Sequence, residues 1–384
     1  MRNVLPAALA VLILGVCFAF LPKPMNPANL EEKIDEIFAD FASLNTPGYA
    51  VGILKDGETL IAKGYGAANL DYQLPITPQS AFPLASVSKR FTGACLALLL
   101  LDGTLRLDDP VAQYIPAVAQ YYPDTLRIWH LGYMSSGLWR YSEQPRTTGT
   151  NWISFNHFTI DTALAAALKR KELRFTPGTS WNYTNTDFML LAKVIEAASG
   201  MPLREFARTR IFEPAGMLNT RVDDDITQVI PNRVSPYNYR SSENVDAYIN
   251  FGIGIREDGS GFIRHPRTSP HYGGSGVNST IEDLLRWGQH MNEKTFGGEA
   301  FHLQYHAARL IPGNENPQAV GLYFSQFEGR TRVQWSGGAE GISTQMVRFP
   351  EQGVVIVVLS NLGTGNADGK ATEIAQALIE DGIL

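Results

Sequence analysis

A serine and a lysine three residues apart offer this chain a nucleophile and a base. Ser86 and Lys89 stand just before a long apolar stretch, Phe91 to Leu101. At the start of a helix, this spacing places the hydroxyl and the amine on one helical face. The helix N-terminus adds backbone N–H groups and a partial positive charge. The pattern predicts a serine activated without a histidine, although so short a motif needs supporting context.

Two other segments offer groups that would suit the surroundings of such a serine. Tyr183 and Asn185 lie one residue apart in a turn-rich loop before a predicted helix, so in an extended loop they point the same way. Trp335 ends a predicted strand, and Gly337 and Gly338 belong to the run of glycines that follows it. Glycine at such a place lets the backbone approach a ligand closely.

Local patterns predict the elements that would hold these residues. Runs 49–55 and 58–65 are typical of strands, and Asp56-Gly57 between them is a strong signal for a two-residue hairpin. Asn29 with Glu32, and Ser279 with Glu282, predict capped helix starts. Residues 236–275 predict loops and short strands. The other predicted helices are Asp161–Arg170, Phe188–Ala198, Ile281–Met291 and Thr372–Ile379, and the other predicted strands are Val320–Phe327, Arg330–Trp335, Gly341–Phe349 and Val354–Ser360.

The order of these elements predicts an α+β fold. Each end of the chain supplies a helix and strands, whereas the middle is mainly helical. The economical arrangement is an antiparallel sheet built from both chain ends, about 28–85 and 300–384, and flanked by helices. A helical region, about 105–235, is inserted between them. We therefore expect one domain over residues 28–380.

The first 24 residues predict export. Arg2 precedes an uncharged apolar run from Val4 to Leu21, and prolines follow it. One basic residue before such a run is typical of a cleaved signal peptide. The run is also nearly long enough to be a retained membrane anchor. Either reading places the rest of the chain outside the cytoplasm, in the periplasm or secreted.

Composition argues against several kinds of function. The net charge of −6 shows no basic excess, so we expect no nucleic-acid partner. Beyond the predicted signal Cys95 is alone, which excludes an internal disulfide and predicts a small buried hydrophobe. His302 and His306 are four residues apart but lack the glutamate of a zinc protease motif, which predicts a surface helix. The Gly-x-Ser-x-Gly pattern marks the nucleophile of α/β-hydrolases, and Gly273–Val277 departs from it at the last position, which argues against that class. We expect neither a metal nor a cofactor.

Several motifs, in order, resemble one family over about residues 30–380. The chain is similar to serine β-lactamases and penicillin-binding proteins, in the class C and esterase-like branch. The resemblance implies a β-lactamase/transpeptidase-like fold. It rests on Ser86-Val87-Ser88-Lys89, Leu107-Asp108-Asp109-Pro110, Ser135-Ser136-Gly137-Leu138, Tyr183-Thr184-Asn185, Phe212-Glu213-Pro214-Ala215-Gly216-Met217, Ser279-Thr280-Ile281-Glu282-Asp283-Leu284 and Trp335-Ser336-Gly337-Gly338.

The resemblance implies a role for each matching residue. Ser86 would form an acyl-enzyme that water then hydrolyses. Lys89 and Tyr183 would share the proton of the serine, with the base left open between them. Asn185 would orient the lysine and a substrate carbonyl. The oxyanion hole would use the backbone N–H groups of Ser86 and Gly338, each contributing roughly 3 kcal/mol in the transition state.

One departure from the family bears on the substrate. β-Lactamases have a lysine, and many relatives a histidine, where this chain has Trp335. An indole supplies no positive charge for a substrate carboxylate. A second departure is Met134, where relatives often have a histidine, and we draw no prediction about function from it. We therefore expect a small-molecule or peptide-like acyl substrate and a carboxylesterase-like serine hydrolase. The alternatives are a D-amino-acid peptidase or class C-type β-lactamase, and a non-catalytic protein that binds cell-wall fragments. Oligomeric state is left open.

Overall fold

The computed structural model describes residues 27–384 except 123, 144–157, 251–254, 257–260 and 267–270. The predicted signal or anchor, 1–24, lies outside the described residues and stays a prediction. Among the described helices, none combines the length and the apolar character that crossing a membrane requires.

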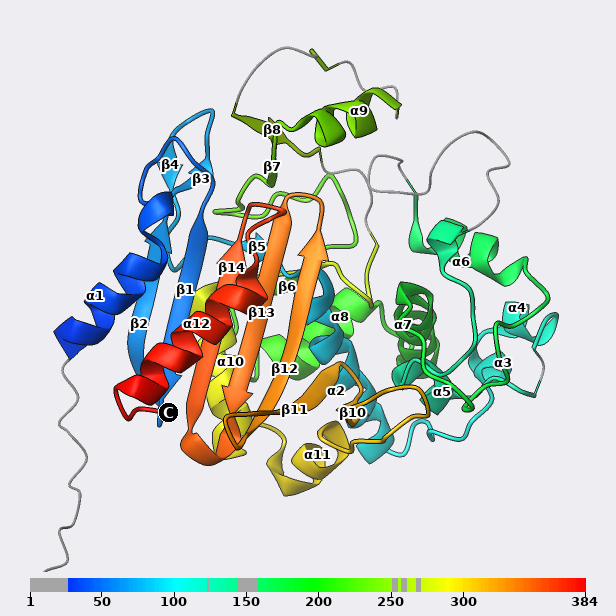
Figure 1. Ribbon diagram of the computed structural model, residues 1–384. Coiled ribbons are helices and arrows are strands. Elements are labelled where there is room, and N and C mark those ends of the chain that lie inside the picture. Colours follow the sequence, from blue (N-terminus) through cyan, green and yellow to red (C-terminus); the bar gives the residue numbers. More distant parts are fainter. Residues whose placement is uncertain (1–26, 123, 144–157, 251–254, 257–260, 267–270) are drawn as a thin grey trace, which may run out of the picture.

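A seven-stranded antiparallel sheet forms the centre of the molecule (Figure 1). Its order is β10-β11-β12-β13-β14-β1-β2, so strands from the two chain ends meet where β14 pairs with β1. This confirms the predicted sheet. The strands are β1 (Tyr49–Lys55), β2 (Glu58–Tyr65), β10 (Gln318–Ala319), β11 (Leu322–Phe327), β12 (Arg330–Ala339), β13 (Ile342–Phe349) and β14 (Val354–Ser360).

The β1–β2 hairpin follows the prediction from its turn. Asp56 and Gly57 both have positive φ, 48° and 83°. That conformation gives a two-residue turn whose twist matches the twist of the strands. Lys55 therefore pairs with Glu58, directly across the turn.

Helices cover both faces of the sheet. α1 (Pro27–Ile37) and α12 (Ala367–Glu380) lie on one face, and α10 (Ile281–Glu293) lies behind the other (Figure 1). Successive β14 side chains alternate between two hydrophobic cores, because side chains of a strand point to opposite faces. Every residue of β14 is accordingly buried.

The inserted helical region is also confirmed. α2 (Lys89–Leu101) packs against α7 (Asn185–Ser199) and against α11 (Gly298–Tyr305). α7 ends at Gly200, whose φ of 71° suits a left-handed C-cap. The remaining helices here are α3 (Val111–Tyr114), α4 (Pro116–Ala119), α5 (Ile128–Gly132), α6 (Ile160–Leu168) and α8 (Leu203–Ala207), followed by a π-helical turn at Arg208–Phe212.

Small sheets and one unexpected helix complete the fold. β7 (Tyr237–Tyr239) pairs with β8 (Phe262–Arg264), as the prediction of short strands requires. The described part of 236–275 also contains α9 (Ser242–Asn250), which was not predicted. The other pairings are β3 (Ala67–Asn69) with β4 (Leu74–Pro75), and β9 (Val277–Ser279) with β5 (Phe82–Pro83) and β6 (Arg221–Val222).

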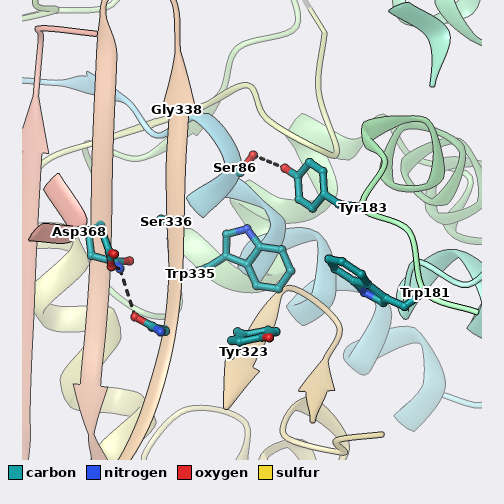
Figure 2. Close-up of a pocket in the computed structure, with 10 residues that line it drawn as sticks. Ser86, Trp181, Tyr183, Tyr323, Trp335, Ser336, Gly338 and Asp368 are labelled. Atoms are coloured by element: carbon teal, nitrogen blue, oxygen red, sulfur yellow. Dashed lines mark hydrogen bonds between the residues drawn. The ribbon is translucent and has the colours of Figure 1, made fainter. Parts of the chain in front are cut away.

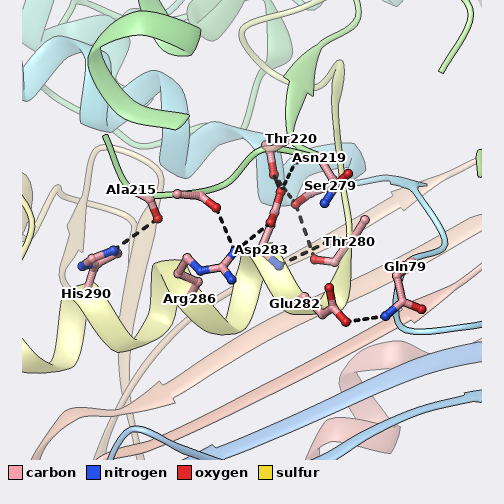
Figure 3. Close-up of polar contacts among 11 residues, drawn as sticks. Gln79, Ala215, Asn219, Thr220, Ser279, Thr280, Glu282, Asp283, Arg286 and His290 are labelled. Carbon is pink, nitrogen blue, oxygen red and sulfur yellow. Dashed lines mark hydrogen bonds and ion pairs between the residues drawn. The ribbon is translucent and has the colours of Figure 1, made fainter. Parts of the chain in front are cut away.

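Two predicted helix caps were wrong. Asn29 lies inside α1, because the helix already begins at Pro27, where proline is well tolerated. Ser279 ends β9, and the cap of α10 is Thr280, whose side chain accepts a hydrogen bond from the Asp283 N–H. Asp283 is itself buried and accepts from Thr220 at 2.8 Å (Figure 3). This network ties α10 to the chain that precedes β6.

Candidate active site

Ser86 lies on a short, tight turn at the N-terminal end of α2. The turn is a 3-10 helix, Ala85–Ser88, and α2 starts only at Lys89. Ala85, directly before the serine, has φ of 45°, a left-handed conformation that costs a residue with a side chain about 1–2 kcal/mol. Such strain is found where a structure must present a functional group in one orientation.

Lys89 is completely buried and lies among four oxygen atoms. Its Nζ is 3.1 Å from Ser86 Oγ, 2.8 Å from the phenolic oxygen of Tyr183, 2.6 Å from Asn185 Oδ1 and 2.6 Å from the carbonyl oxygen of Gly274. The last two are acceptors only, so each takes one N–H. The third position on Lys89 Nζ faces the hydroxyls of Ser86 and Tyr183. There it donates as an ammonium or accepts a proton as an amine.

Tyr183 contacts both Ser86 and Lys89, so the polar atoms of the three side chains form a triangle. Its phenolic oxygen is 2.6 Å from Ser86 Oγ (Figure 2). Burial raises the pKa of Tyr183, but the charge and hydrogen bond of Lys89 outweigh burial, so the pKa lies below its ordinary value. Burial also lowers the pKa of Lys89, partly offset by Tyr183. Lys89 and Tyr183 therefore titrate as a coupled pair, because the charge of each one changes the proton affinity of the other.

The loop that carries Tyr183 and Asn185 is fixed from several directions. Thr184 caps α7, with its side chain accepting from the Thr186 N–H, so Asn185 starts the helix and faces Lys89. Arg140 donates Nε to the Tyr183 carbonyl at 3.1 Å. Ser136 donates to Asp187 Oδ1 at 2.6 Å, one turn into the same helix. Sequence spacing predicted that Tyr183 and Asn185 would point together, and the structure confirms it.

Strand β12 brings its glycines against the turn that carries Ser86. The predicted strand ended at Trp335, which was wrong, because β12 runs to Ala339 and pairs throughout with β13. A Cβ atom on Gly337 would lie 2.6 Å from the Leu84 carbonyl oxygen and 2.9 Å from the Ser86 nitrogen. A Cβ on Gly338 would meet nothing within 4 Å. Glycine at 337 is therefore required by close approach of two backbones.

A cavity of about 440 Å³ opens beside Ser86. Four aromatic rings line it, with Trp335 in the middle of the view in Figure 2 and 6.4 Å from the ring of Tyr323. Asp368, at the start of α12, contributes a carboxylate, and the described lining contains no lysine, arginine or histidine. The lining residues are Ser86, Trp181, Tyr183, Tyr323, Gln334, Trp335, Ser336, Gly338, Gln345 and Asp368.

Sequence reasoning missed Gly274, whose carbonyl holds Lys89. The sequence marks 273–276 only as a failed serine motif, although three glycines in four residues also indicate close packing. A Cβ on Gly274 would lie 2.9 Å from Asn185 Oδ1. Only the fold shows this contact, because 185 residues separate Gly274 from Lys89.

The remaining predicted residues divide into one confirmation and one correction. Cys95 is a buried free thiol, as predicted. The prediction of a surface helix for His302 and His306 was wrong, since His302 is 4% exposed and the helix packs against α2. Within the described ranges, no three metal-ligating side chains gather into a cluster.

Comparison with known proteins decides the family. The sequence profile of the family described as Beta-lactamase matches residues 30–381. The chain belongs to the beta-lactamase family. It is 30% identical to penicillin-binding protein 4* of Bacillus subtilis over 84% of this chain and 69% of that protein. It is 26% identical to a D-aminopeptidase of Gluconobacter oxydans over 91% of this chain, which spans only 62% of that enzyme.

The fold of this chain matches that of a class C beta-lactamase of known structure. The TM-score is 0.73 at 18% identity, over 92% of this chain and 98% of the other. Family and fold therefore agree with the predicted resemblance. The protein is a serine hydrolase.

Proposed function

We propose that Ser86 is the nucleophile and that Lys89 and Tyr183 jointly take up and return its proton. The contacts of 2.6 and 3.1 Å from Ser86 Oγ to Tyr183 and Lys89 support this. A serine hydroxyl needs an adjacent base to remove its proton. Two groups that share one proton can take up the serine proton without the site having to stabilise either group in its charged form. The same proton is then available for the leaving group, as general acid.

The backbone N–H groups of Ser86 and Gly338 form the proposed oxyanion hole. Gly337 holds β12 against the Ser86 turn, and Gly338 lies next to it in the cavity lining. Donors fixed by a strand and a tight turn need no reorganisation as charge develops on the substrate oxygen. Asn185, which accepts a hydrogen bond from Lys89, is the residue that we propose to orient the lysine and the substrate carbonyl.

The substrate class follows from the charge of the cavity, which carries the proposal. The described lining has a single carboxylate, Asp368, and no cationic side chain. Arg140 and Arg332 lie outside this lining, where Arg140 donates to the Tyr183 carbonyl and Arg332 to Ser325 Oγ. A substrate with a free carboxylate, as in a β-lactam, finds no counter-ion among the described lining residues, and Arg332 outside the lining is within electrostatic reach of Asp368.

A substrate with a free ammonium group fits the same cavity. Asp368 provides a counter-charge, and the faces of the aromatic rings attract cations. The name of the related D-aminopeptidase favours the D configuration for the amino acid in the acyl part of the substrate. We therefore propose hydrolysis of amides or peptides whose acyl part is a D-amino acid with a free amino group.

Neutral esters are the second candidate. Trp335 favours them, because its large apolar face can pack against an uncharged acyl chain. The carboxylesterase activity predicted from the sequence is therefore a proposal that rests on Trp335 alone. Export of the protein also remains a prediction.

A substrate panel tests these proposals. The panel comprises D- and L-aminoacyl p-nitroanilides, the N-acetylated D-compound, a p-nitrophenyl butyrate ester and a chromogenic cephalosporin, with Ser86→Ala as control. We expect turnover in the order free D-amine, neutral ester, cephalosporin, and no turnover by Ser86→Ala. Asp368→Asn should lower kcat/KM about fivefold for the free amine alone, since the carboxylate is exposed and its ion pair with substrate is screened.

Two results would contradict distinct parts of the proposal. If a fluorophosphonate failed to label folded wild-type protein at Ser86, the nucleophile assignment would be wrong. If the N-acetylated compound reacted as fast as the free amine, labelling would still support Ser86 while the assignment of the ammonium group would fail.

A further inference from the structure

A second buried polar cluster lies behind the sheet, away from the cavity. Arg90 on α2 and Arg348 on β13 are each 1% exposed. Trp287 and Asn292 on α10, and Tyr305 on α11, surround them. We call these five residues the Arg90–Arg348 cluster.

The two guanidinium groups have neutral partners only. Arg90 donates to the Met346 carbonyl at 3.2 Å. Arg348 donates to Asn292 Oδ1 at 3.0 Å and contacts His306 Nε2 at 2.7 Å. Burial lowers the pKa of His306 to about 3, so the ring is neutral at neutral pH, and its Nδ1 lies 3.0 Å from the His302 carbonyl oxygen, which makes Nδ1 the donor and Nε2 the acceptor. Among the described residues, no carboxylate oxygen lies within 4.0 Å of either guanidinium.

Several donors in the cluster also have no partner. Arg90 Nε, Trp287 Nε1, Asn292 Nδ2 and the Tyr305 hydroxyl are all buried and hydrogen-bond to no described residue. The rings of Trp287 and Tyr305 are 6.0 Å apart, and the indole N–H lies near enough to the Tyr305 oxygen to lower the pKa of that hydroxyl, as both arginines do, so Trp287 is the least free of the four donors. Three donors without any partner, the Trp287 N–H and two positive charges without a carboxylate partner therefore belong to one cluster.

Buried charge without compensation is among the most expensive features a fold can contain. Each unpartnered donor adds its own desolvation cost. One negative ion accepting from these donors would remove both costs. Tyr305 is a poor substitute for that ion, because burial raises the pKa of its hydroxyl and keeps it a donor.

We propose that the Arg90–Arg348 cluster binds one small monovalent anion of the halide type. A halide accepts hydrogen bonds from any direction, which suits donors that come from three helices and a strand. Arg90, Arg348, Trp287 and Tyr305 are each at most 2% exposed, which disfavours larger, strongly hydrated anions such as phosphate. The ion would fasten α2, the helix of Lys89, to α10, α11 and the sheet. This inference does not depend on the proposed substrate.

Thermal unfolding of the full chain tests the proposal. Protein refolded in sodium gluconate is titrated with sodium chloride or bromide up to 200 mM at constant ionic strength. We expect a saturating rise of about 2 °C or more in the unfolding midpoint, because a ligand that binds only the folded state stabilises it by mass action. Crystals grown in bromide should show one anomalous scattering peak among Arg90, Trp287 and Tyr305.

Variants separate this site from general salt effects. Arg348→Met should abolish the saturating rise, whereas the matched change Arg204→Met, at a side chain that is 56% exposed, should leave it intact. If Arg348→Met fails to fold, Tyr305→Phe serves instead. It should weaken halide binding several-fold if the hydroxyl is a donor, and strengthen binding if a phenolate is the counter-ion. A wild-type midpoint independent of halide, with no bromide peak, or stronger binding in Tyr305→Phe, would overturn the proposal.

Discussion

Replacement of Gly337 by alanine is the sharpest test of how the site is assembled. The added methyl would lie 2.3 Å from Thr344 Oγ1, 2.6 Å from the Leu84 carbonyl oxygen and 2.9 Å from the Ser86 nitrogen. Thr344 cannot move freely, because its hydroxyl donates to that same carbonyl at 2.8 Å. Strand β12 must therefore retreat from the Ser86 turn by roughly 0.5–1 Å to reach normal contact distances.

That displacement separates the two proposed oxyanion donors. A shift of this size at a reacting group costs up to about a hundredfold, and loss of one oxyanion donor costs about 10²–10³-fold. We expect kcat/KM of Gly337→Ala to fall at least about a hundredfold, equivalent to about 2.7 kcal/mol. Overpacking should also lower the free energy of unfolding by about 1–3 kcal/mol.

The neighbouring glycine provides a matched control. A methyl on Gly338 meets nothing within 4 Å and keeps the N–H, so Gly338→Ala should lose far less, within about tenfold. Turnover of the most reactive substrate in the panel and the rate of fluorophosphonate labelling measure both variants, with thermal melts to show that they fold. If folded Gly337→Ala keeps activity within threefold of wild type, the close approach of β12 and the Ser86 turn does not control the chemistry.

Three further predictions concern ionisation and charge. Because the pKa values of Lys89 and Tyr183 both lie below their ordinary values and the pair must lose one proton to act, kcat/KM should rise with pH and level off well below pH 10. A rise that continued beyond pH 10 would contradict this. Burial raises the pKa of Asp187 well above its ordinary value, so its folded form favours the proton and wild type loses stability as pH rises towards the folded pKa. Asp187→Asn should remove that loss, with a gain in unfolding free energy at pH 8 and none at pH 4, and equal gains at both would refute the assignment. Trp335→Lys puts a cation into the cavity and should raise acylation by the chromogenic cephalosporin several-fold over wild type, as mass spectrometry of Ser86 would show.

Sequence predicted the features that depend on neighbours along the chain. The β1–β2 hairpin follows from Asp56-Gly57, and the C-terminus of α7 follows from Gly200, because both need a backbone conformation that few residues adopt. Ser86 and Lys89 face one another because three residues make about one turn. Local errors occurred where tertiary pairing decides the outcome. Ser279 has a residue type suited to a cap, but pairing with Phe82 keeps it in β9.

Contacts between distant segments could not be predicted from local pattern. Gly274 holds Lys89 through a carbonyl group, which every residue has, so no residue type marks it. Arg90 and Arg348 gave no signal either, because arginines in a sequence are usually exposed and paired. α9 was missed although Val245, Tyr248 and Ile249 stand at helical spacing, because three apolar residues within a segment rich in aromatic residues and glycine are too short a pattern to mark a helix.

The distribution of positive charge separates the chemistry from substrate recognition. Lys89 is the basic side chain that contacts Ser86, but it donates N–H groups to Asn185 and Gly274 and is not among the residues that line the cavity. It can therefore move a proton but cannot pair with a carboxylate on a substrate. In a family whose third motif often begins with lysine, Trp335 removes that second cation and leaves Asp368 as the charge in the lining. The proposed nucleophile and base can thus stay unchanged while the proposed preference for substrate charge is reversed, which is why substrates that differ in charge alone test the proposed function most directly.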